Sequence, residues 1–265
     1  MTWSMSFYRA TIQYDGTDYS GFQWQAGAAS IQGELNLALQ SIHAGKITTG
    51  GASRTDSGVH AVEQVVKITT ENPIAFTVDE FNQALPKEIR CLALDPCEGD
   101  FNPNTKTTSK EYRYLFTNKS HVIESERRFV TNVSYQFDIE AMKRCAQRLI
   151  GTHDFCNFYS MGSNVKTTIR EVYACELSTI NPHAVFSHTQ VFKFPTELTQ
   201  CYQLKIKANG FLKQMIRHTI RALWMVGSGR ITEQQFVDYL NGPKAEKQLW
   251  KVAAPNGLFL YRITY

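Results

Sequence analysis

The chain has 265 residues, 43% hydrophobic content and a formal net charge of +4. This length is enough for one large domain or two smaller ones with a sizeable core. No apolar run approaches the ~18 residues of a membrane helix, and the first ten residues lack the order of a signal peptide. These features argue against a membrane protein and predict a soluble, cytoplasmic one.

The six cysteines are scattered along the chain, and none forms a Cys-x-x-Cys pair. No histidine or second cysteine lies beside them at zinc-finger spacing. Isolated cysteines in an intracellular protein usually pack as small hydrophobic residues. We therefore expect neither disulfides nor a structural metal.

The first half of the chain shows both strand and helix patterns. Residues 8–14 alternate in polarity and predict a strand, which the turn residues Asp15 and Gly16 end. Ser30 is a plausible N-cap of an amphipathic helix at 31–42. The further elements predicted in this half are strands at 64–69, 89–94 and 110–116 and a helix at 78–85.

The second half repeats this mixture. Its predicted elements are helices at 137–151, 211–226 and 232–240 and strands at 167–179, 202–208 and 258–265. Residues 181–199 have two prolines and little pattern, so we expect a long loop or an irregular hairpin. Because strands and helices do not alternate strictly, the order predicts an α+β fold. We expect two lobes, 1–115 and 116–265, and a cleft between lobes is a common place for a site.

Residues 50–61 form a stretch of small residues with one carboxylate, Asp56, between Arg54 and Gly58. Glycines in such a loop allow unusual backbone angles and the close approach of a ligand. The same residues are also ordinary turn chemistry, in which Asp56 would bond to its own backbone. The stretch alone leaves both interpretations open.

Six basic residues and no acidic ones lie between Lys205 and Arg230, which suits a phosphate-rich partner. Lys213, Arg217 and Arg221 are four residues apart and are predicted to form one stripe of a helix. A solvated basic face is an equal alternative for Lys213. For Arg217 we expect a paired and partly buried role, because burying an unpaired charge is costly.

Tyr112 and Tyr114 alternate on one face of the predicted strand at 110–116. Strand aromatics are more often part of the core than a platform for a ligand. Stacking on a nucleic acid base is nevertheless a known use of them. Both interpretations remain open for these two residues.

Five segments in sequence order point to one family. Residues 53–61, SRTDSGVHA, resemble the signature GRTDAGVHA of tRNA pseudouridine synthase A. The other four are similar to the family's YDGT…GWQ, KxYxY, A[DN]xF…MVR and GLYL segments and lie at 14–25, 110–114, 208–217 and 257–260. The five segments are spread over nearly the whole chain. Each one alone is weak, but their occurrence in the family's order argues against coincidence.

The resemblance implies a two-lobed pseudouridine synthase fold. This fold has a mixed, largely antiparallel central sheet, flanking helices and a cleft between the lobes. The resemblance also implies a homodimer that acts on tRNA and needs neither a cofactor nor a metal. The expected reaction converts uridine to pseudouridine at nucleotides 38–40 of the anticodon stem-loop.

The resemblance assigns roles to single residues of this chain. Asp56 would be the catalytic nucleophile, Arg54 would help to turn the target base outward, and Arg217 would be the partner of the aspartate. The expected substrate-binding residues are Tyr112 against the flipped uracil, Leu258 on the wall of the base pocket, and Lys213 on RNA phosphates.

Some positions depart from the family's pattern. They are Ser53 and Ser57 in the signature, Phe22 for the usual Trp, Asn104 for a common Arg, His218 for Asn and Arg221 for Gly. The small replacements should have little effect. The last three lie near the expected RNA surface and bear on the choice of uridine more than on the reaction.

Two other functions remain open. The first is a non-catalytic RNA-binding protein that kept the fold, such as a tRNA folding chaperone. The intact set of Arg54, Asp56, Tyr112 and Arg217 argues against it, because binding alone does not need Asp56. The second is a sister synthase that acts on another tRNA arm or another RNA.

Overall fold

The computed structural model describes residues 5–105, 107–119, 123–162 and 165–265. The chain divides into two compact units. Unit 1 comprises residues 1–108, 186–193 and 259–265, and unit 2 comprises residues 109–185 and 194–258. These units are defined by contacts, and the predicted lobes 1–115 and 116–265 stay a prediction.

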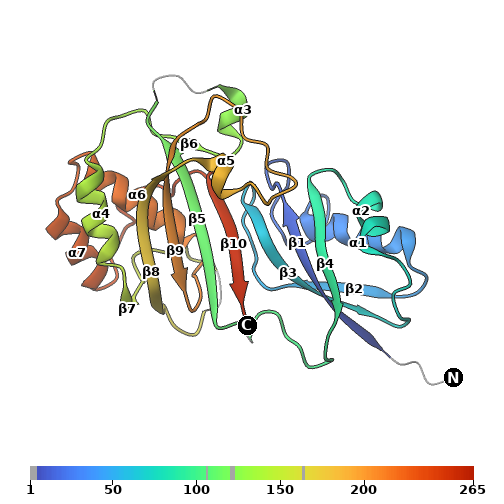
Figure 1. Ribbon diagram of the computed structural model, residues 1–265. Helices are drawn as coiled ribbons and strands as arrows, with labels where there is room; N and C mark the ends of the chain where they lie inside the picture. Colours follow the sequence, from blue (N-terminus) through green and yellow to red (C-terminus); the bar gives the residue numbers. More distant parts are fainter. Residues whose placement is uncertain (1–4, 106, 120–122, 163–164) are drawn as a thin grey trace. The chain divides into compact units, whose positions relative to one another are not determined.

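Unit 1 is a sheet in the order β4-β1-β3-β10, with β2 also paired to β3. Its strands are β1 (Ser6–Tyr14), β2 (Ile47–Gly51), β3 (His60–Thr70), β4 (Ile89–Pro96) and, from residue 259 on, β10 (Leu258–Thr264). The pairs of β3 with β1 and β2, and of β1 with β4, are antiparallel, whereas β10 runs parallel to β3. Two helices, α1 (Ile31–Ile42) and α2 (Val78–Ala84), pack against β2 and β4 (Figure 1).

The sequence explains where these helices begin. The side chain of Ser30 accepts a hydrogen bond from the Gly33 N–H at 3.2 Å and caps α1 as predicted. Thr77 and Glu80 form a capping box at the start of α2. The apolar face of α1, with Ile31 and Leu35, is fully buried, which fixes the helix on the sheet.

Unit 2 contains the strands in the order β5-β9-β8-β7, with β6 paired to β5. Its strands are β5 (Ser109–Thr117), β6 (Thr131–Asn132), β7 (Gly151–Asp154), β8 (Ile169–Ile180) and β9 (Cys201–Ala208). All pairs are antiparallel except β5 with β6. The helices are α3 (Glu124–Arg127), α4 (Ile139–Gln147), α5 (Pro182–Val185), α6 (Met215–Gly227) and α7 (Glu233–Asn241).

Helix α6 is the central helix of unit 2, and it contacts both α4 and α7 (Figure 1). Its Trp224 meets the rings of Tyr114 and Phe116 on β5, at 5.8 and 5.5 Å between centroids. Tyr114 is therefore a core residue, as the more common interpretation of strand aromatics holds. A helix that is buried nearly all round, like α6, holds its few polar side chains in fixed places.

The predicted α+β class with largely antiparallel pairing is confirmed. Two local expectations were wrong. Gly50 and Gly51 end strand β2 and do not belong to a loop. Helix α6 begins at Met215, not at residue 211, so Lys213 lies before the helix and does not share a helical stripe with Arg217.

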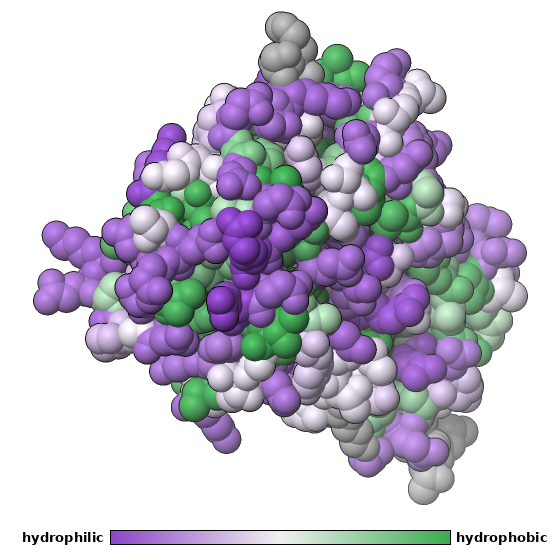
Figure 2. Space-filling view, turned by 60° about the vertical axis from the view of Figure 1, so that its left-hand side comes forward, coloured by the Kyte–Doolittle hydropathy of each residue, from purple (hydrophilic) through white to green (hydrophobic). Residues whose placement is uncertain are grey.

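The described part of the chain contains no helix that is both long and apolar enough to cross a membrane. Some large hydrophobic side chains reach the surface, among them Met161 and Leu249. On the face shown in Figure 2, hydrophilic residues surround small separate hydrophobic patches. Single apolar residues on a surface are ordinary.

Candidate active site

The candidate catalytic loop, residues 52–59, joins β2 to β3 in unit 1. Just before the loop, the end of β2 passes close to an aromatic ring: a Cβ on Gly51 would stand 2.3 Å from the Phe22 ring. Only glycine allows this approach. The Gly51 carbonyl also accepts a hydrogen bond from the Asn104 side chain at 3.0 Å. The glycine thus provides close packing at this position, and not the loop conformation expected for it.

Two buried side chains hold the first half of the loop. The Gln64 amide accepts from the Ser53 N–H at 3.2 Å and donates to the Ser53 carbonyl at 2.6 Å. The Tyr14 and Thr55 hydroxyls are 2.7 Å apart. Ser53 and Thr55 are therefore buried and fixed, while Arg54 between them is exposed.

The second half of the loop is a tight turn around Asp56. The Val59 N–H donates to the Asp56 carbonyl at 3.2 Å, and Gly58 has a φ of +75°. A positive φ at the third residue of a turn favours glycine, so this glycine has the role expected from the sequence. The side chain of Asp56 is half-buried.

A buried histidine, His60, lies directly behind the loop. Its Nδ1 accepts a hydrogen bond from the Gly16 N–H at 3.1 Å and lies 3.2 Å from an Asp15 oxygen. This nitrogen is thus within hydrogen-bond distance of both a backbone N–H and a buried carboxylate, which fix the position of the ring. The ring stacks on Phe259 at 4.7 Å and meets Phe192 edge-on at 5.9 Å.

Sequence reasoning did not identify this supporting shell. Its members are Tyr14, Gln64 and His60. A signal was present, because Tyr14 and His60 both belong to segments that resemble the family's motifs. Gln64 and Tyr14 are 11 and 41 positions from the loop residues that they contact, so these contacts could not be derived from local pattern.

Unit 2 contains the other predicted site residues. Tyr112 on β5 is 6% exposed, and its ring meets Phe211 edge-on at 5.1 Å. Leu258 at the start of β10 is buried, and its N–H donates to the Pro255 carbonyl at 2.9 Å. Lys213 is exposed. Burial and the contact with Phe211 hold the Tyr112 ring in one orientation.

Arg217 is nearly buried, with 8% of its surface exposed. Its Nε donates to the Ala253 carbonyl at 2.7 Å, and the Ala253 N–H donates to the Arg217 carbonyl at 3.2 Å. Side chain and backbone are thus both tied to one residue. A guanidinium that is taken out of water needs such partners, and this arrangement confirms the partly buried role expected for Arg217.

The basic strand β9 has neighbours of both charges in the sheet of unit 2. Lys207 stands opposite Glu111 on β5, and Lys205 stands opposite Arg113 on β5 and Glu176 on β8. These acidic residues are distant in sequence. Opposite charges on neighbouring strands interact, so this sheet carries a mixed pattern of charge.

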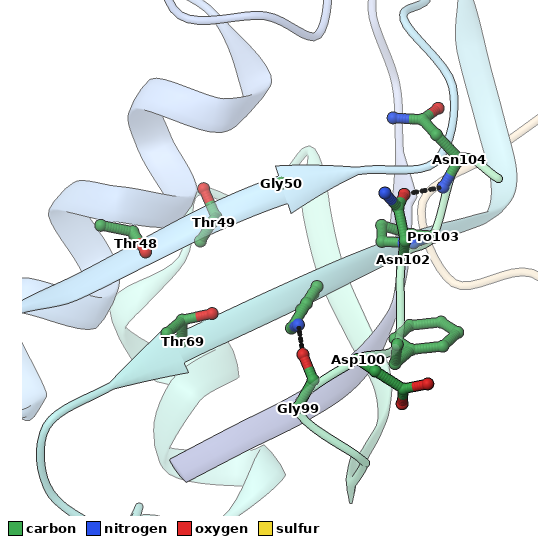
Figure 3. A pocket seen from close by; sticks show the side chains of 11 residues that line it. Thr48, Thr49, Gly50, Thr69, Gly99, Asp100, Asn102, Pro103 and Asn104 are labelled. Atoms are coloured by element: carbon green, nitrogen blue, oxygen red, sulfur yellow. Dashed lines mark hydrogen bonds between the residues drawn. The ribbon is translucent and has the colours of Figure 1, made fainter. Parts of the chain in front are cut away.

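A polar pocket of about 440 Å³ lies in unit 1 beside the start of the loop (Figure 3). Residues of β2, β3 and the segment 99–104 line it. The Lys67 ammonium donates to the Gly99 carbonyl at 2.5 Å, and the Asn104 N–H donates to the Asn102 side chain at 2.9 Å. A Cβ added to Gly50 would meet nothing within 4 Å. The lining is suited to a hydrogen-bonding ligand.

Comparison with known proteins agrees with these features. The family model described as tRNA pseudouridine synthase matches residues 145–265. The chain is 34% identical over 256 residues to tRNA pseudouridine synthase A of Thermoanaerobacter sp. strain X514, covering 96% of this chain and 97% of that protein.

Two further relatives bear the same name. The protein of Listeria welshimeri is 33% identical over 268 residues, covering 98% of this chain and all of the relative. That of Oceanobacillus iheyensis is 31% identical over 265 residues, covering 97% and 96%. With such identity over nearly the full length of both chains, this chain belongs to the tRNA pseudouridine synthase family, which is a family of isomerases.

Proposed function

We propose that the chain converts uridine to pseudouridine in tRNA, at nucleotides 38–40 of the anticodon stem-loop, with Asp56 as nucleophile. The loop at 52–59 carries this proposal. Buried Ser53 and Thr55 anchor it, and the intervening Arg54 is exposed next to half-buried Asp56. Such rigid support is what a reacting group needs, because small misplacements cost much of the rate.

The reaction accounts for these residue types. The bond between the uracil N1 and the ribose C1′ breaks, the base turns, and a bond from C5 to C1′ forms. The proton lost from C5 ends on N1, so the product is an isomer of the substrate. Asp56 attacks C1′ or, in the competing route, takes a proton from the sugar. Either role requires a charged carboxylate, and a guanidinium close to a carboxylate favours its charged form.

The remaining site residues have proposed roles in binding. The target base must leave its stack, which costs a few kcal/mol, and Arg54 assists this step. Tyr112 lies against the flipped uracil, and Leu258 closes the apolar wall that excludes water. Arg217 is the partner of Asp56. Lys213, which is exposed, contacts phosphates and conveys no base identity.

The protein is further proposed to act as a homodimer in the cytoplasm, where its tRNA substrate is used. The family of the curated relatives supports the tRNA substrate. Sedimentation velocity at several protein concentrations tests the dimer. A monomer at all concentrations would reject it without affecting the proposed reaction.

The reaction is tested on total tRNA from a strain that lacks the endogenous synthase. Pseudouridine is mapped by chemical labelling after incubation with the purified protein. We expect product at nucleotides 38–40. Product at another nucleotide would support the sister synthase, and the absence of product would support the RNA-binding protein.

The nucleophile is tested by Asp56→Asn, which removes the charge at nearly constant size. We expect no product, while folding and tRNA binding are retained. Asp79→Asn is the matched control, since Asp79 is an exposed residue in the first turn of α2 of the same unit. Pseudouridine formation by Asp56→Asn at the rate of the control would show that the nucleophile is another group.

A further inference from the structure

The start of helix α6 has an unusual backbone. Gln214 is the one residue other than glycine with a positive φ in the described ranges, at φ 59° and ψ 12°. Side chains with a Cβ rarely adopt this conformation, and it persists where surrounding structure holds it. Gln214 lies three residues before Arg217, so its conformation sets where the first turn of α6 points.

Ser160 makes three contacts with this turn. Its N–H donates to the Lys213 carbonyl at 3.0 Å, and its hydroxyl donates to the Gln214 side-chain oxygen at 2.6 Å. The same hydroxyl oxygen lies 3.0 Å from His218 Nε2. One residue thus connects the backbone before Gln214, the Gln214 side chain and the first turn of α6.

The contacts define the tautomer of His218. With the Gln214 amide oxygen facing Ser160, the single hydroxyl proton is used toward Gln214, and His218 donates from Nε2. His218 is 2% exposed, and Nδ1 has no hydrogen-bond partner among the described residues. Burial and the neighbouring Arg217 charge lower the pKa of His218 to about 4, which keeps the ring neutral near pH 7.

Ser160 is itself held by the structure around α7. The Asn157 side chain donates to the Tyr239 carbonyl at 2.8 Å and accepts from the Ala245 N–H at 2.8 Å. Phe158 is fully buried and meets the Phe236 ring. The loop that carries Ser160 therefore acts as a fixed support for α6.

We propose that Ser160, Gln214 and His218 form a positioning network that fixes the start of α6 and thereby the direction of the Arg217 guanidinium. The helix start holds Arg217 from one side, and the Ala253 carbonyl holds its Nε from the other. The inference rests on the proposed function, in which Arg217 is the partner of Asp56. None of the three network residues needs to touch the substrate.

The test compares substitutions that remove or restore single hydrogen bonds. Ser160→Ala removes the central hydroxyl, and His218→Phe keeps a ring without the donor. His218→Gln restores an N–H after the same number of bonds as Nε2. We expect kcat on tRNA to fall about tenfold or more in the first two variants, with KM changed less than about twofold. His218→Gln should recover most of kcat.

Thr219→Val is the control within the same helix. Its hydroxyl is buried and donates only locally, to the Met215 carbonyl at 2.9 Å, so its loss should leave kcat unchanged. Wild-type kcat in folded Ser160→Ala and His218→Phe would overturn the network. A rise in KM without loss of kcat would also overturn it, because the residues would then act in tRNA binding.

A measurement on the wild-type protein tests the network independently of activity. Nitrogen-15 NMR of the His218 ring near pH 7 should show the neutral tautomer with the proton on Nε2. A proton on Nδ1 would overturn the hydrogen-bond order, whether or not the variants fold. Absence of pseudouridine with the wild-type protein would reject the proposed function. The NMR measurement would still show whether the hydrogen bonds of the network are arranged as proposed, because it does not depend on activity.

Discussion

His218 should make the protein sensitive to acid. The pKa of this ring is lowered from 6.5 to about 4 by burial and by the Arg217 charge. Folding therefore favours the neutral ring. The stabilisation is complete above pH 6.5, where the ring is neutral in the folded and unfolded chains, and it is lost as the pH falls from 6.5 toward 4.

The magnitude follows from the two pKa values. At about 1.4 kcal/mol per pKa unit, the total loss below pH 4 is about 3.5 kcal/mol. At about pH 5 the unfolded ring is nearly all protonated and the folded ring is mostly neutral, so the loss is already about 2 kcal/mol. The ring is almost fully buried, and solvent screening reduces this value little.

Urea unfolding of the wild type and His218→Gln at about pH 8 and pH 5 isolates this contribution. Other groups titrate equally in both proteins, so they cancel in the comparison. From about pH 8 to pH 5, the free energy of unfolding of the wild type should fall by about 2 kcal/mol more than that of the variant. Equal losses within about 0.5 kcal/mol would refute the conclusion that folding holds His218 neutral.

Two further predictions concern packing and thiols. Gly51→Ala should lower the free energy of unfolding by about 1–3 kcal/mol, because the new methyl overlaps the Phe22 ring, whereas Gly50→Ala should not destabilise the protein. Urea unfolding measures both variants. Equal effects would contradict the close approach of the Gly51 backbone to the Phe22 ring. Burial raises the pKa of all six thiols, but only Cys97 and Cys156 are half-buried and accessible to a reagent. Alkylation of the folded protein near pH 8 should therefore modify these two first, as read by peptide mass spectrometry. The protected cysteines are Cys91, Cys145, Cys175 and Cys201. Rapid modification of these four without unfolding would show that the core opens.

Local sequence patterns determined most secondary structure and the fold class. The predicted strand at 8–14 lies within β1, and the predicted helix at 31–42 coincides with α1 and its Ser30 cap. Strand and helix periodicities and caps involve residues a few positions apart, so a single chain displays them directly. The ordered motifs also led to the family, which comparison then confirmed.

Tertiary structure decided what each site residue contacts. Helix α6 begins at Met215, after Gln214 with its positive φ, and the Gln214 side chain is bonded to Ser160, more than fifty residues earlier in the chain. Sheet pairing places Glu111 on β5 and Glu176 on β8 opposite lysines of β9. The sequence thus determined which residues are candidates for the chemistry. The folded chain alone decided their supports and their charge environment, because hydrogen bonds and ion pairs depend on distance in space.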